Sequence, residues 1–296
     1  MMPWRMWLIV VGVLLTGTGG VGMAGPLIVA HRAGNLNWPE NTICGFAAAR
    51  QAGVDAIELD VQVSKDGVPV VYHPDDLGQW TTTKGMVADH TWAELRQLDV
   101  AKGFKGAVPF DCAPEERKIP SLAQVLERIP ETPLILDFKS LPATPLVEAI
   151  VKVIPPTEWR RITVYSTQAE HLEAMKAHRP DAVLFENRAT TFARLVKVKA
   201  GEDCALPNAA PWIGFELRRA LDECERFKLG SNCVTLPPQQ MWTPESTHCA
   251  RRMVRGAKLA FFGINTVADY TLAAKLGADA VYTDDPKLLV GARRKR

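Results

Sequence analysis

The stretch VDAIELDVQV, residues 54–63, places two carboxylates inside a pattern that is otherwise typical of a buried β-strand. Glu58 and Asp60 are two positions apart, and the residues between and beside them are apolar. Successive side chains of a strand point to opposite faces, so both carboxylates share one face. If helices cover the apolar face, the carboxylates point into a barrel near its C-terminal rim.

Short apolar runs along the chain alternate with stretches whose apolar spacing is typical of helices. This alternation predicts parallel strands joined by crossover helices, and eight strands are the number in a (β/α)₈ barrel. The predicted fold class is therefore α/β, a TIM barrel with insertions, over residues 26–291. A further segment, 212–218, could be a strand that replaces one of the eight. The eight predicted strands are 27–30, 56–61, 68–72, 134–138, 162–165, 182–185, 258–262 and 280–283.

Two long stretches, residues 74–120 and 188–248, are predicted to be excursions that roof the barrel, because both are longer than ordinary connections between strands and helices. Asp66-Gly67 predicts a two-residue hairpin turn before strand 68–72, which would then be antiparallel and no regular barrel strand. The clearest helices are predicted over 42–52, 121–129, 168–177 and 266–276.

The composition is that of a globular protein. The chain has 296 residues, of which 47% are hydrophobic and 23% charged, and its formal net charge is +2. A disordered chain would carry fewer apolar residues, and a nucleic-acid-binding protein would usually carry a basic excess. We therefore expect a small-molecule substrate and no nucleic-acid partner. Residues 292–296 are predicted to be a solvated basic tail, and no oligomeric state is predicted.

The first 24 residues predict a secretory signal peptide. Arg5 precedes an apolar run, and small residues precede a cleavage site after Ala24. We therefore expect an exported protein, periplasmic or extracellular. The alternative is an uncleaved anchor formed by residues 7–23, in which case the chain would contact a membrane. The string GTGGVG at 17–22 matches a dinucleotide-binding loop, but no helical pattern follows it.

Six cysteines in a chain predicted to be exported allow disulfides. Four of them fall within residues 204–249 and predict a stapled excursion. Cys44 lies on the apolar face of the helix predicted to begin at Thr42, and we predict it to be a small core residue. The chain has no Cys-x-x-Cys pair, which argues against a zinc or redox motif.

A third carboxylate follows the same strand pattern as the first two. In LILDFKS, residues 134–140, Asp137 and Lys139 alternate with apolar residues and reach the same rim. Carboxylates gathered there without a partner are costly unless a cation binds them. Three carboxylates without cysteine or paired histidine predict a hard-ion site, so Glu58, Asp60 and Asp137 are expected to bind Ca²⁺ or Mg²⁺. The alternative is neutralisation by arginine or lysine.

Two histidines, His31 and His73, each directly follow a predicted strand. The C-terminal ends of barrel strands carry catalytic residues, and histidine exchanges protons near neutral pH. We therefore predict an acid/base pair rather than two hydrogen-bonded structural residues. Arg32 and Lys139 could bind an anionic oxygen. With a cation, these groups predict a site for a phosphate ester.

Five segments together carry a family resemblance. They are AHRAGNLNWPENT (30–42), GVDAIELDVQVSKDGVPVVYHPDDL (53–77), IPSLAQVL (119–126), LILDFK (134–139) and LGADAVYTDDP (276–286). From about residue 27 to 290 the chain resembles the glycerophosphodiester phosphodiesterase family. The resemblance implies a barrel enzyme that hydrolyses glycerophosphodiesters to glycerol phosphate and an alcohol with a divalent cation. The roles it implies are acid/base catalysis by His31 and His73, phosphate binding by Arg32 and Lys139, and metal binding by Glu58, Asp60 and Asp137.

Three positions depart from the usual pattern of that family. Ala33 stands where glycine usually follows His-Arg, although Gly34 comes next. Asp137 stands where glutamate is usual, and its shorter side chain favours Ca²⁺ slightly, since Mg²⁺ tolerates little distortion. Residues 261–265, FFGIN, lack a tryptophan that is often found there, so we expect a different alcohol pocket with Asn265 as a candidate polar contact.

Two other functions fit the same residues. A phospholipase D-like lyase would release a cyclic phosphate as its final product. A non-catalytic envelope protein that binds phosphorylated headgroups would tolerate the shortened side chain of Asp137.

Two polar segments have structural interpretations. In PENT, residues 39–42, Asn41 or Thr42 is predicted to cap the first helix, which leaves Glu40 free to bond to the loop or to substrate hydroxyls. Asp284 and Asp285 are predicted to form a barrel-closing turn, capped by aspartate before Pro286.

Overall fold

The structure is a computed structural model that describes residues 25–105, 112–203, 210–228, 230–253 and 256–295. The predicted signal or anchor segment, residues 1–24, lies outside the described residues, and so does Cys204. Within the described part of the chain, no helix combines the length and the apolar character needed to cross a membrane.

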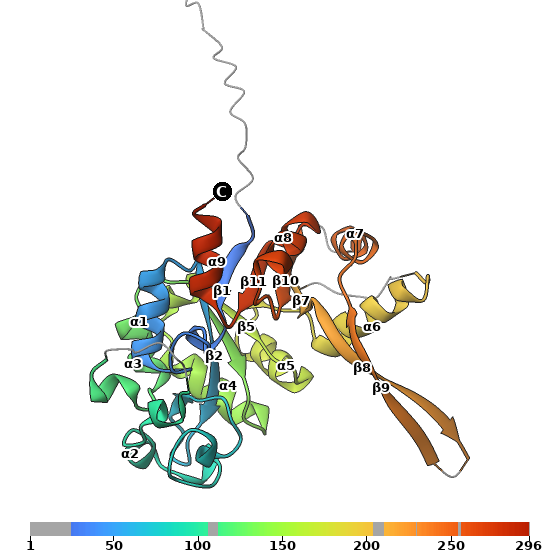
Figure 1. The fold of residues 1–296 in the computed structure, drawn as a ribbon. Coiled ribbons are helices and arrows are strands. Elements are labelled where there is room, and N and C mark those ends of the chain that lie inside the picture. Colours follow the sequence, from blue (N-terminus) through green and yellow to red (C-terminus); the bar gives the residue numbers. More distant parts are fainter. Residues whose placement is uncertain (1–24, 106–111, 204–209, 229, 254–255, 296) are drawn as a thin grey trace, which may run out of the picture.

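Eight parallel strands form a nearly closed barrel (Figure 1), which confirms the predicted fold class. A parallel bridge between Phe185 and Trp212 brings the two ends of the sheet together. The strands are β1 (Leu27–Ala30), β2 (Ala56–Val63), β4 (Leu134–Phe138), β5 (Ile162–Tyr165), β6 (Val183–Leu184), β7 (Trp212–Glu216), β10 (Lys258–Phe262) and β11 (Ala280–Thr283). Their order around the barrel is β6-β5-β4-β2-β1-β11-β10-β7.

One predicted strand is not part of the barrel wall. Strand β3 (Pro69–Val71) pairs antiparallel with β2, after a turn in which Gly67 adopts a φ of +80°. The hairpin predicted from Asp66-Gly67 is therefore confirmed. β7 takes the place of β3 in the barrel wall and pairs in parallel with β10 over five residues. It lies in the segment 212–218, which was predicted as a possible replacement for one of the eight strands.

Helices cover the outside of the barrel (Figure 1). The four predicted helices are confirmed to within two residues, and the side chains of Thr42, Ser121 and Thr266 each accept a hydrogen bond from the first turn of their helix. The helices are α1 (Ile43–Ala52), α2 (Trp92–Leu95), α3 (Leu122–Arg128), α4 (Ala143–Val153), α5 (Ala169–His178), α6 (Arg188–Lys199), α7 (Pro244–Met253), α8 (Val267–Lys275) and α9 (Pro286–Arg293).

The apolar core has an outer and an inner layer. Ile57, Leu59 and Val61 of β2 are fully buried in the outer layer, between the strands and the helices. The intervening carboxylates of β2 therefore point into the barrel, as the alternation predicted. The inner layer is aromatic toward one side, where Tyr165 contacts Phe185 edge to face.

The second excursion, residues 188–248, does not roof the barrel as a whole. It contains α6, β7 and a long ribbon of β8 (Arg218–Phe227) and β9 (Gly230–Gln240), which extends away from the barrel (Figure 1). A disulfide between Cys224 and Cys233 joins the two ribbon strands, which confirms the predicted staple.

The prediction for Cys44 as a plain core residue is wrong in one respect. Its side chain is buried, but it forms a disulfide with Cys112, 68 residues away. The bond ties the end of the first excursion to α1. Cys249 is also disulfide-bonded, and no free cysteine occurs among the residues that the structure describes.

The inner layer leaves no room for a side chain at Gly214 of β7. A Cβ atom on Gly214 would lie 2.5 Å from a ring atom of Phe262 and 2.8 Å from one of Phe185. We expect Gly214→Ala to lower the free energy of unfolding by about 1–3 kcal/mol through overpacking, as measured by denaturant titration. Gly291→Ala in α9 is the control, because a Cβ there meets no atom within 4 Å. Equal stability of the two variants would contradict this view of the barrel interior.

Candidate functional site

Three carboxylates meet at the C-terminal rim of the barrel, as predicted. Glu58, Asp60 and Asp137 each offer an oxygen within 4.8 Å of the others, and all three side chains are buried. The cause is strand register, because β2 and β4 are parallel neighbours in which Asp60 lies opposite Asp137. Two carboxylates from one strand and one from the next therefore share one pocket.

The segment PENT holds one of these carboxylates in place. Asn41 donates from Nδ2 to Asp60 Oδ2 at 2.8 Å, and its own Oδ1 accepts from the Asp60 backbone N–H at 3.2 Å. Asn41 has a φ of +55°, a conformation that asparagine tolerates better than most residues. The helix cap is Thr42, so one of the two predicted candidates is confirmed and the other orients a carboxylate.

The two predicted cations lie against the carboxylates. Lys139 Nζ is 2.5 Å from Asp137 Oδ2 and 3.0 Å from Asp60 Oδ1. Arg32 Nε is 3.4 Å from Asp60 Oδ2. Although burial opposes ionisation, these two cations hold the pKa of Asp60 below its usual range. The sequence left open whether a metal ion or basic side chains neutralise the carboxylates. For Asp60, lysine and arginine do so.

The other two carboxylates remain short of positive charge. Burial, with repulsion from Asp60, raises the pKa of Glu58, and burial raises the pKa of Asp137 despite its contact with Lys139. Asp137 Oδ1 is buried and accepts no hydrogen bond from the described residues. Oxygen donors with this excess of negative charge suit a hard divalent cation. The residues present therefore fit the predicted ion.

His31 lies in this site and has a carboxylate partner that the sequence did not predict. Its Nδ1 is 2.7 Å from Asp284 Oδ1, and its Nε2 is 3.9 Å from Glu58 Oε2. Asn265 donates from Nδ2 to the second oxygen of Asp284 at 2.8 Å, so the predicted polar contact of Asn265 is to this carboxylate. Asp284 was expected only to form a turn. Its position directly after the last barrel strand was the available signal.

The two histidines have opposite electrostatic surroundings. Burial disfavours a charged His31, but Glu58 and the hydrogen bond to Asp284 outweigh it and raise the pKa of His31. Burial lowers the pKa of His73 to about 4, although Asp60 opposes this shift. His73 is therefore neutral near pH 7, whereas His31 binds a proton more readily than a free imidazole.

The loop after β1 is held in an unusual backbone conformation. Arg32, Ala33 and Gly34 have φ angles of 53°, 81° and 96°. Residues with a side chain avoid this region, so Ala33, where glycine was expected, keeps the glycine-like conformation at a cost of about 1 kcal/mol or more. The Arg32 backbone N–H donates to Glu58 Oε2 at 2.9 Å, which fixes the loop to the carboxylate cluster.

A cavity of about 470 Å³ opens at the barrel mouth beside these groups. Its far wall contains residues that the sequence did not single out. Arg188 donates to both oxygens of Glu216, at 2.5 and 2.8 Å, and to the Tyr165 hydroxyl at 3.2 Å. Phe262 lines the same cavity in the FFGIN segment. Asp66 and Asp285, by contrast, lie outside it and are structural, the latter capping α9.

Comparison with known proteins places the chain among phosphodiesterases. A family model described as "Glycerophosphoryl diester phosphodiesterase family" matches residues 31–288. An uncharacterised protein from Mycobacterium tuberculosis is 37% identical over 297 residues, which cover 96% of this chain and 97% of the relative. A glycerophosphodiester phosphodiesterase from Caldanaerobacter subterraneus is 28% identical over 274 residues, 91% of this chain and 98% of that protein.

Solved structures share the same architecture. The crystal structure of a glycerophosphoryl diester phosphodiesterase domain from Mycobacterium tuberculosis has a TM-score of 0.79 and 36% identity, and the match covers 92% of this chain and 99% of that one. An Oleispira antarctica phosphodiesterase in complex with the product sn-glycerol-3-phosphate has a TM-score of 0.67 and 22% identity, with 92% and 98% covered. The second likeness is one of fold.

The contact between His31 and Asp284 gives a test of the site. In Asp284→Asn, Asn265 Nδ2 still requires an acceptor, so the new amide must present its NH₂ group to His31 Nδ1. A donor at that position requires an unprotonated Nδ1 and disfavours the protonated imidazole. We expect kcat/KM for a phosphodiester to fall by about 10² or more. Asp285→Asn is the matched control, because an asparagine oxygen can still accept from Leu288 N–H and cap α9. Equal activity of the two variants would contradict the role of Asp284.

Proposed function

The chain belongs to the glycerophosphoryl diester phosphodiesterase family, and from this premise we propose that its barrel mouth hydrolyses glycerophosphodiesters with a divalent cation and a pair of histidines. Membership of the family makes the protein a phosphoric diester hydrolase with glycerophosphodiesterase activity. The observation that carries the finer proposal is the convergence of His31, Arg32 and Lys139 on a buried cluster of carboxylates. The glycerol phosphate bound to the Oleispira antarctica enzyme supports glycerol phosphate as a product.

Glu58, Asp60 and Asp137 would hold the cation. When bound, it supplies positive charge that stabilises the phosphodiester oxygens as negative charge develops on them. Asp137 is shorter than the glutamate usual in the family, and this favours Ca²⁺, whose coordination is the more flexible.

Arg32 and Lys139 bind the phosphate. Both lie at the rim and keep part of their surface exposed, 19% and 21% of the side chain. A guanidinium fork and an ammonium group are suited to two different phosphate oxygens. They neutralise the substrate without needing to change their own protonation.

The two histidines divide the proton transfers. His31 has the raised pKa and the carboxylate partner, so it holds a proton and donates it from Nε2 to the leaving alkoxide. His73 has the lowered pKa, so it is neutral and takes the proton from the nucleophile. Asp284 accepts from Nδ1, which stabilises the protonated form of His31 and holds the ring in the orientation that this step requires.

Disulfides support a site of action outside the cytoplasm. Cys44–Cys112 and Cys224–Cys233 are stable in an oxidising compartment, and the sequence predicts export by residues 1–24. We propose a periplasmic or extracellular enzyme.

The proposed activity is tested by turnover of glycerophosphocholine and glycerophosphoethanolamine with and without Ca²⁺ and Mg²⁺. Phosphorus NMR distinguishes glycerol phosphate as the final product from a cyclic phosphate, which would indicate the lyase instead.

The histidine roles predict a difference between substrates. His31→Ala and His73→Ala should each lower kcat/KM for glycerophosphocholine by about 10² or more. A nitrophenyl phosphodiester needs no proton on its leaving group, so it should restore much of the activity of His31→Ala and little of that of His73→Ala. The exposed His178→Ala is the control. If the nitrophenyl substrate restored the activity of His73→Ala but not that of His31→Ala, the two roles would be the reverse of those proposed.

The same roles predict the pH dependence of the unmodified enzyme. Activity should be lost as pH falls toward the His73 pKa of about 4 and as pH rises through the raised His31 pKa, because the base must be neutral and the acid protonated. A profile of kcat/KM with a single limb would contradict the pair.

Removal of metal gives an independent test. Chelation with EDTA should abolish hydrolysis, and Ca²⁺ or Mg²⁺ should restore it. The cation should also raise the Tm of the wild-type protein, since it binds only the folded state. This rise should disappear in Asp137→Asn and persist in Asp75→Asn, a change at an exposed carboxylate. Hydrolysis that is indifferent to chelation would exclude the proposed metal dependence.

A further inference from the structure

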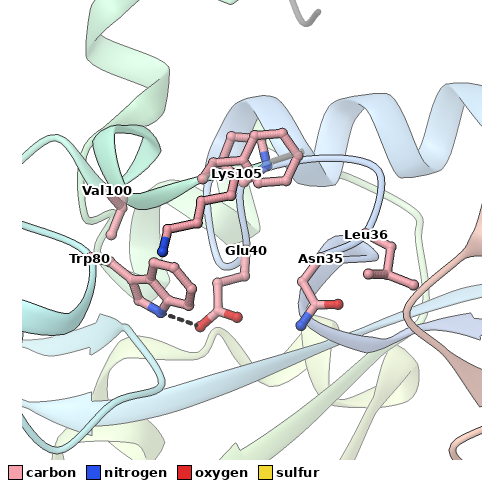
Figure 2. Close-up of a pocket in the computed structure, with 8 residues that line it drawn as sticks. Asn35, Leu36, Glu40, Trp80, Val100 and Lys105 are labelled. Atoms are coloured by element: carbon pink, nitrogen blue, oxygen red, sulfur yellow. Dashed lines mark hydrogen bonds between the residues drawn. The ribbon is translucent and has the colours of Figure 1, made fainter. Parts of the chain in front are cut away.

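A second cavity of about 350 Å³ lies beside the reaction centre, between the loop after β1 and the first excursion. Leu36, Val100 and Phe104 give it apolar walls, and Trp80 and Glu40 also line it. Figure 2 shows Trp80 and Asn35 on either side of Glu40, with the side chain of Lys105 above Glu40 in this view and its nitrogen toward Trp80. None of these residues has a role in the proton transfers.

One side-chain contact links this cavity to the barrel mouth. Arg32 lines the mouth, and its Nη1 is 3.5 Å from Oε2 of Glu40 in the second cavity. A phosphodiester extends two organic arms from its phosphorus. A phosphate bound by Arg32 can therefore send one arm into the mouth and the other toward Glu40.

The polar atoms of the second cavity are mainly acceptors. Glu40 is only 8% exposed, and its Oε1 accepts a hydrogen bond from Trp80 Nε1 at 3.0 Å. Asn35 Oδ1 is buried and accepts no hydrogen bond within the described part of the chain. A buried acceptor without a partner is unfavourable, so a ligand with hydrogen-bond donors is favoured.

Charge narrows the class of ligand. Glu40 is the one carboxylate among the residues that line this cavity, and it already contacts Arg32 at 3.5 Å. Lys105 lines the same cavity, so its charge further disfavours a cationic headgroup. Hydroxyl groups satisfy this environment, because they donate to Asn35 and Glu40 and accept from Lys105. The aromatic and aliphatic walls suit the carbon side of a polyol.

We infer that this cavity binds the polyhydroxylated arm of the substrate. The inference rests on the proposed function in that it assumes a phosphate ester bound by Arg32. The arm is either the glycerol common to all glycerophosphodiesters or a polyol headgroup such as inositol. Both present the same chemistry to Asn35, Glu40 and Lys105.

Calorimetry with monoesters tests the inference without requiring turnover. Ethyl phosphate, glycerol phosphate and inositol phosphate are titrated into the full chain in Ca²⁺. The variants are Asn35→Leu, which keeps the side-chain size, and Lys105→Met, which lies at an exposed position and leaves the fold intact. Lys102→Met, at an exposed lysine that does not line the cavity, is the matched control.

We expect the two cavity variants to reduce the preference for a polyol phosphate over ethyl phosphate by about tenfold, as loss of one hydrogen bond to a buried or charged group implies. A lower preference for both glycerol phosphate and inositol phosphate assigns the cavity to glycerol. A lower preference for inositol phosphate alone assigns it to the headgroup.

Unchanged preferences, or equal weakening of ethyl phosphate, would overturn the inference. Failure of the proposed hydrolysis would appear in the turnover assays, while these binding ratios would still be measurable. The two outcomes are therefore distinguishable.

Discussion

The site depends on three buried carboxylates that the protein itself only partly neutralises. Glu58, Asp60 and Asp137 lie within 4.8 Å of one another in a barrel that excludes water from their side chains. Burying a charged side chain away from water costs several kcal/mol unless an opposite charge pairs with it. Lys139 and Arg32 stabilise Asp60, whereas the pKa values of the other two remain raised. Binding of a divalent cation would release these protons, so metal affinity and pH are coupled.

The surrounding structure keeps that cluster from relaxing. Strand register fixes Asp60 opposite Asp137, and Asn41, directly before the cap of α1, holds the Asp60 carboxylate. The left-handed backbone of Arg32 is stabilised by its N–H bond to Glu58. The left-handed conformations of Arg32 and Asn41 are costly in isolation and persist because their neighbours hold them in place. The rim is therefore rigid before substrate arrives, which reduces the reorganisation needed for catalysis.

The barrel and most of the site were predictable because they follow local rules. Period-two alternation placed Glu58 and Asp60 on one face, and turn chemistry at Asp66-Gly67 predicted the hairpin. The contact of His31 with Asp284 spans 253 residues and forms only when the last strand pairs with the first. The Cys44–Cys112 bond likewise depends on where the first excursion returns. No local pattern encodes either contact, because the first depends on barrel closure and the second on the path of the excursion.

Arg32 links the chemistry to substrate choice. Its backbone is fixed by Glu58 and its side chain by Asp60 and Glu40. Arg32 lines the barrel mouth, and Glu40 lines the second cavity. Glu40 consequently orients Arg32 and forms part of the second cavity, so replacing it would alter catalysis and specificity together. The residues at positions 80, 100, 104 and 105 belong to an insertion outside the barrel wall. With a substrate arm in this cavity, changes at positions 100, 104 and 105 would alter substrate preference without replacing any residue of the phosphate site, the cation site or the histidine pair.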